Sequence, residues 1–145
     1  MNMKKQNYDE RQLLARSKAF EYGFAAYLFE SVIWCVLCEL LKIDAEPLGE
    51  LCLLLTPPFV VFAIVCIVRD AYDPISTRPG MIVFALMPLA ALLTILRYLR
   101  DEEVLLDGRC LTAAGGLVFL EAGWLVLAVV YWICYARSGR ETDGE

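Results

Sequence analysis

Apolar residues fall in four long runs that are separated by short polar segments. The runs cover residues 24–41, 48–68, 80–96 and 111–136. A bilayer core of about 30 Å needs roughly 20 consecutive apolar residues in a helix, and each run reaches or approaches that length. The pattern therefore predicts four transmembrane helices. The second run contains Pro57-Pro58 and should bend there, because two neighbouring backbone N–H donors are missing.

A further helix is predicted directly ahead of the first run, over residues 8–23. Asn7 followed by Glu10 resembles a capping box, which marks the start of a helix. A modest stripe at helical spacing is formed by Leu13, Leu14, Ser17, Phe20 and Phe24. We expect an amphipathic helix on the cytoplasmic face that continues into the first span.

Composition agrees with a membrane protein. Hydrophobic residues make up 59% of the 145 residues, and the mean hydropathy is +0.57. Soluble domains contain about 45–50% apolar residues, so lipid must be part of the solvent of this chain. The predicted fold class is an all-α polytopic membrane protein: one domain, residues 1–145, formed by a four-helix bundle. The first run has no small-residue cleavage motif, and we interpret it as a retained span and not a signal peptide.

Charge excludes some classes of function. The net charge is −5, whereas a nucleic-acid-binding protein needs a basic face, so no nucleic-acid partner is expected. The chain has no histidine, and so lacks the usual general base and the commonest metal ligand. Neither a metal nor a cofactor is predicted.

The distribution of lysine and arginine predicts the orientation in the membrane. Nine of these residues lie on the side of the termini: Lys4, Lys5, Arg11, Arg16, Lys18, Arg69, Arg78, Arg137 and Arg140. Four lie on the other side: Lys42, Arg97, Arg100 and Arg109. Cytoplasmic segments carry the excess of positive charge, so both termini of this multi-pass protein should be cytoplasmic.

Two acidic residues fall inside predicted spans. Glu30 lies about 9 Å into the first span and Glu121 about 15 Å into the fourth, at 1.5 Å per residue. A carboxylate at such depth suggests a proton relay or a substrate site. The alternative is a protonated acid that hydrogen-bonds across helices and holds them together. The possible partners are Thr56, Thr94 and Tyr98.

The first span also contains a Cys-x-x-Cys, formed by Cys35 and Cys38. The string Cys-Val-Leu-Cys, with Lys42 four positions on, resembles the DsbB-type quinone-linked disulfide-forming proteins, which have four spans and cytoplasmic termini. That resemblance implies a thiol–disulfide redox role. The opposing interpretation is inert packing, because a thiol in an apolar run behaves as a small hydrophobe. In architecture the chain also resembles the small multidrug resistance transporters, which have four spans and one embedded acid where Glu30 lies.

A resemblance that covers the first half of the chain rests on two motifs. The first is Asp9-Glu10-Arg11-Gln12 before a span, and the second is Arg69-Asp70-Ala71-Tyr72 after the second span. Both resemble an uncharacterised class of small integral membrane proteins of Gram-positive bacteria with an N-terminal Asp-Glu-Arg-Gln motif. The resemblance implies a bacterial inner-membrane protein and assigns no catalytic residue.

The first motif also predicts contacts on the cytoplasmic side. Arg11 can meet Asp70 or Asp73, and Glu10 can meet Arg69 or Arg78. We expect a clasp of this kind, or a solvated, well-capped helix start; exposed ion pairs of this kind contribute only about 0–1 kcal/mol each.

The sequence favours a non-enzymatic role as a small membrane component that senses, scaffolds or regulates. The expected partners are the lipid bilayer and either another membrane protein or further copies of this chain. One alternative is a small proton- or solute-linked transporter that uses an embedded glutamate. The other is a redox protein that uses the two thiols of the Cys-x-x-Cys.

Overall fold

The computed structural model describes residues 10–69, 71, 78–101 and 104–142, with backbone alone for 78–79 and 138–142. Four long helices make up most of the described chain: α1 (Glu10–Leu41), α2 (Pro47–Val68), α3 (Arg78–Arg100) and α4 (Ala113–Thr142). Each is long and apolar enough to cross a membrane. The predicted all-α, four-span membrane fold is therefore confirmed.

The predicted N-terminal helix continues into the first span, as expected, and the two form one helix, α1. Other helix boundaries differ from the predicted ones. Helix α3 extends to Arg100, beyond the predicted end at residue 96. Residues 111 and 112, which we expected to open the last span, lie outside α4. Thr112 caps α4 instead, because its Oγ1 accepts a hydrogen bond from the N–H of Gly115 at 3.1 Å. The cap sets the start of α4 at Ala113.

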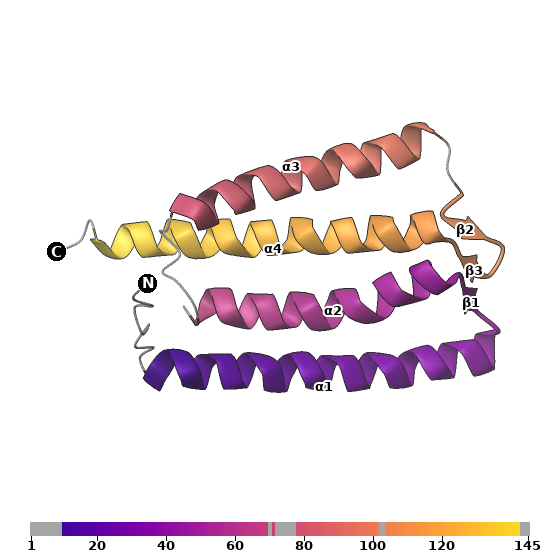
Figure 1. Cartoon of the computed structure of the whole chain (residues 1–145), viewed down its shortest axis with the longest axis horizontal. Helices are drawn as coiled ribbons and strands as arrows, with labels where there is room; N and C mark the ends of the chain where they lie inside the picture. The colour runs from indigo at the N-terminus through magenta and orange to yellow at the C-terminus, as the bar shows by residue number, and fades with distance from the viewer. Residues whose placement is uncertain (1–9, 70, 72–77, 102–103, 143–145) are drawn as a thin grey trace, which may run out of the picture.

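The helices lie side by side in one open row, in the order α1, α2, α4, α3 (Figure 1). Its extensive interfaces join α1 to α2, α2 to α4 and α4 to α3. Helices that follow one another along the chain are antiparallel, so the central helices α2 and α4 run in one direction. The edge helices α1 and α3 both run in the other direction. The start of α1 and the end of α4 lie at the same end of the bundle.

Glycines bring the backbones of α2 and α4 close together. A Cβ added at Gly116 would lie 2.5 Å from the Cα of Gly49, and one at Gly123 would lie 2.6 Å from Cγ2 of Thr56. In lipid, small residues allow this approach and the dispersion contacts that hold helices together. The two glycines of α4 therefore set the distance between the central helices.

Small residues of α1 also face α2. Ala15, Ala19 and Gly23 are buried and follow each other at four-residue spacing, which places them on one face of the helix. The larger residues of the predicted stripe, among them Leu14 and Phe24, are mostly exposed. They belong to the outer surface of the row, while the small residues allow α2 to approach.

A small three-stranded sheet closes the end of the bundle opposite the termini, and the sequence pattern did not predict it. Strand β3 (Cys110–Leu111) pairs in parallel with β1 (Asp44–Ala45) and antiparallel with β2 (Leu106–Asp107). Side chains add further links between the two loops. Glu46 accepts a hydrogen bond from the N–H of Ala113 at 2.8 Å. Arg109 donates to the carbonyl of Leu41 at 2.9 Å. The α1–α2 and α3–α4 connections thus form one unit.

We predict that Gly116→Leu destabilises the protein by about 1–3 kcal/mol, because the side chain would push α2 and α4 apart. The measurement is unfolding in detergent followed by circular dichroism. The control is Ala122→Leu, on an exposed face of the same helix, which should change the unfolding free energy by less than half as much. Equal effects of the two substitutions would contradict the assigned role of Gly116.

Candidate functional site: the polar layer between α1 and α2

Helix α2 lies between two neighbours. Gly49 and Thr56 contact α4 before Pro57-Pro58, and Phe59 contacts it after them, with the rings of Phe59 and Trp124 5.6 Å apart. Phe62 packs beside Gly23 of α1, where an added Cβ would lie 3.1 Å from the Cβ of Phe62. Figure 1 shows the first half of α2 turned toward α4 and away from α1. Pro57-Pro58 lie inside α2, where the missing N–H donors predict a bend.

Trp34 bridges the wider part of the α1–α2 interface. Its side chain is buried, with 8% of the residue exposed, and its Nε1–H donates to Oε1 of Glu50 at 2.9 Å. Glu50 belongs to the first turn of α2, where a carboxylate also interacts favourably with the helix dipole. The indole therefore fills space that the bend opens and ties α1 to the start of α2.

Glu30 lies one turn before Trp34 on the same face of α1. The residue is half-buried, and its Oε2 is buried without a hydrogen-bond partner. The expected threonine partners are engaged elsewhere: Thr56 donates to the carbonyl of Cys52 at 2.6 Å, and Thr94 to that of Ala90 at 3.0 Å. A buried acceptor without a donor costs free energy, so this carboxyl favours a proton or an incoming donor.

Glu121 belongs to a different interface. It is half-buried in α4 and forms no hydrogen bond or ion pair with any residue that the structure describes. It shares a helix face with Leu125, Ala128 and Trp132, which line a cavity beside Pro88 of α3. Glu30 faces α2 and Glu121 faces α3, so the fold does not combine the two acids into one site.

The six cysteines are free thiols. Cys35 is exposed on the surface of the row, and Cys38 is half-buried. The charged groups that act on Cys38 are the carboxylates of Glu39, Asp44 and Glu50. A reactive thiolate is favoured by positive charge, whereas these groups are all acidic.

The N-terminal motif is only partly covered by the structure. Glu10, Arg11 and Gln12 open α1, whereas Asp9, Asp70, Tyr72 and Asp73 lie outside the described residues. Glu10 and Arg69 form no ion pair with each other. The link between α1 and the α2–α3 connection is instead made by Arg16, whose Nε donates to the carbonyl of Ala71 at 2.8 Å. Residue Ala71 itself is fully buried.

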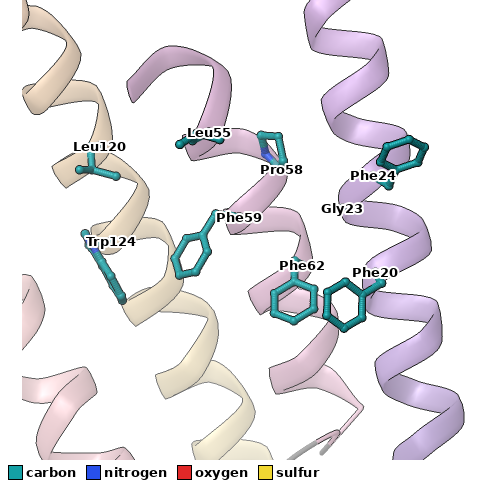
Figure 2. Close-up of a pocket in the computed structure, with 9 residues that line it drawn as sticks. All are labelled: Phe20, Gly23, Phe24, Leu55, Pro58, Phe59, Phe62, Leu120 and Trp124. Atoms are coloured by element: carbon teal, nitrogen blue, oxygen red, sulfur yellow. The ribbon is translucent and has the colours of Figure 1, made fainter. Parts of the chain in front are cut away.

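Glu30, Trp34 and Glu50 form what we call the polar layer between α1 and α2. An apolar groove of about 650 Å³ opens beside it, between α1, α2 and α4. Figure 2 shows that aromatic rings form most of its wall. It is lined by Phe20, Gly23, Phe24, Leu55, Pro58, Phe59, Phe62, Leu120 and Trp124. Sequence reasoning missed the groove because its wall is assembled from three helices. Glu30 is not among its lining residues.

Sequence reasoning also missed Glu50 as the partner of Trp34. The available signal was its place in the first turn of a span, opposite a tryptophan in the preceding span. Among the described residues, no three cysteine or acidic side chains are grouped closely enough to hold a metal ion.

Comparisons of the chain with protein-family models, with curated proteins and with solved structures gave no match. The fold alone therefore defines the class: an all-α integral membrane protein with four spans.

We predict that Trp34 and Glu50 are energetically coupled. In a double-mutant cycle of Trp34→Phe and Glu50→Ala, the coupling free energy should be about 0.5–1.5 kcal/mol, the value of one partly buried hydrogen bond. The measurement is unfolding of the full chain in detergent. A cycle of Trp132→Phe with Glu50→Ala is the control, because Trp132 donates to the carbonyl of Phe84 and should show no coupling to Glu50. Equal coupling in both cycles would contradict the contact.

Proposed function

We propose that this protein is a non-enzymatic membrane component that holds or regulates a partner at its cytoplasmic end. The observation that carries the proposal is the unequal length of the helices. At 1.5 Å per residue, α1 is about 48 Å long and α4 about 45 Å, whereas α2 and α3 are about 33–35 Å. A hydrocarbon core is about 30 Å thick, so the two longer helices extend beyond it.

Both extensions belong to the same end of the molecule. The last turn of α1 and the first turn of α4 are tied to the three-stranded sheet, through Leu41 and Ala113. The surplus length of each helix therefore lies at its other end, near the start of α1 and the end of α4 (Figure 1). These turns form what we call the inner platform, residues 10–20 and 132–142. The excess of lysine and arginine on this side supports a cytoplasmic location.

The inner platform is suited to docking because it is anchored and carries exposed charges. Arg16 attaches α1 to the α2–α3 connection through the carbonyl of Ala71. Arg11 and Arg137 are exposed, and Lys18 pairs with Glu21 at 2.8 Å on the surface. An anchored surface with charges of both signs fits a protein partner, since charge complementarity selects partners and sets orientation.

The partner proposal predicts that a photo-crosslinking residue at Arg11 captures a discrete protein adduct in native membranes. The matched control carries the same residue at Leu106, which is exposed at the opposite end of the bundle. We expect one dominant adduct from position 11, reduced at least fivefold by charge reversal at Arg137, and none of that size from position 106. The absence of an adduct at position 11, or the same adduct from both positions, would contradict the proposal.

A second candidate function is proton- or solute-linked transport, favoured by the buried Oε2 of Glu30 that lacks a partner. A transported proton or solute would have to reach this carboxyl from water. The same carboxyl is also consistent with a neutral acid sealed between two helices. Water access distinguishes the two arrangements.

For a transporter we expect Glu30→Cys to react with a membrane-impermeant thiol reagent in intact vesicles. The control is Val32→Cys, an exposed position that faces lipid two residues away. Wild-type protein supplies the background from the native thiols. Labelling at position 30 at least tenfold faster than at position 32 supports transport. Equal, background-level labelling would leave Glu30 as a packing residue and remove this candidate.

A further inference from the structure

Exposed charges of opposite sign lie at the same end of the two edges of the helix row. Glu39 in the last turn of α1 has 83% of its side chain exposed and forms a long, exposed ion pair with Lys42 at 3.8 Å. Arg100 ends α3 and is exposed as well. At 3.6 residues per turn, Glu39 lies about 160° around α1 from Gly23, which contacts α2. Arg100 lies about 180° around α3 from the buried Ala91. Both charges therefore point away from the row.

Matching apolar stripes precede these two charges. At 4, 7, 11 and 14 residues before the charge, each edge presents an exposed, uncharged side chain. The α1 edge stripe consists of Cys35, Val32, Leu28 and Ala25. The α3 edge stripe consists of Leu96, Leu93, Leu89 and Leu86. Alternating steps of three and four residues form the seam along which two helices pack knobs into holes.

The stripes also differ in size in a complementary way. The α3 edge stripe is made of leucines alone, whereas the α1 edge stripe includes the smaller Ala25 and Cys35. Large side chains of one helix then have room against the small ones of the other. Helices α1 and α3 run in the same direction (Figure 1). Two copies side by side in one membrane would therefore place the two stripes parallel, with Glu39 and Arg100 toward the same end.

We propose that copies of this chain associate head-to-tail, with the α3 edge stripe of one copy against the α1 edge stripe of the next and Arg100 paired with the neighbour's Glu39. A symmetric contact between two α1 edges would oppose two glutamates, and one between two α3 edges would oppose two arginines. A head-to-tail contact repeats, so it forms rings or filaments and does not stop at a dimer. This inference does not depend on the proposed function.

Disulfide crosslinking in membranes tests the contact directly. Leu96→Cys places a thiol four residues before Arg100, level with the native Cys35 four residues before Glu39. Oxidation should produce dimers, trimers and larger species, and adding Cys35→Ser should remove at least nine-tenths of them. The control Ala90→Cys is exposed and lies about 120° around α3 from Leu96, and it should crosslink at least tenfold less. Absence of a ladder, a ladder that survives Cys35→Ser, equal crosslinking at position 90, or dimers alone would each overturn the proposal.

A second measurement uses energy transfer between labelled full-length chains in lipid vesicles. Arg100→Glu and Glu39→Arg should each weaken association roughly two- to fivefold, the effect of one exposed ion pair. The variant with both substitutions should regain most of the association of the native chain. Energy transfer that is absent for the native chain, or that is unchanged in both single variants, would overturn the proposal. Circular dichroism confirms that each variant retains its helices.

Discussion

The close contact of α2 with α4 is the constraint on which the rest of this structure depends. In lipid there is no hydrophobic driving force between helices, so their association relies on close packing and on hydrogen bonds. Gly49, Gly116 and Gly123 supply that packing by letting backbones meet. Since α2 must also contact α1, the same helix serves two neighbours, and the bend at Pro57-Pro58 makes this possible.

The polar layer follows from that bend. The first half of α2 is turned toward α4. At the end of the bundle that carries the sheet, small residues therefore do not fill the α1–α2 interface. Trp34 fills it and uses its one N–H on Glu50. Glu30, one turn away, is left with a buried oxygen that no neighbouring donor satisfies. A position of this kind is either a site of protonation or a cost of packing, and the proposed labelling experiment separates the two.

An open row has consequences that a closed bundle does not. Each edge helix has one extensive neighbour, so a broad apolar face of α1 and of α3 is left to lipid or to another copy. The two ends of the row also differ. One end is closed by strands and side-chain caps, while the opposite end is formed by the two longer helices, α1 and α4. The proposed docking and the proposed self-association therefore use separate surfaces.

The sequence by itself determined the class of protein and much of its outline. Four runs of apolar residues required four spans, because the length of such a run against the bilayer thickness leaves few alternatives. Glu30, Glu121 and the cysteines were visible as candidates on the same grounds. Their surroundings were not, since hydropathy does not say which faces of two helices meet.

Only the tertiary structure showed which residues and which helices contact each other. It placed Glu30 and Glu121 in different interfaces and paired Trp34 with Glu50. It also joined two outer loops in a sheet whose strands are only two residues long, too short to produce a period in the sequence. The physical reason is that lipid-facing and helix-facing residues are equally apolar here. Which helices contact each other depends on small residues and on one bend, and not on any pattern of polarity.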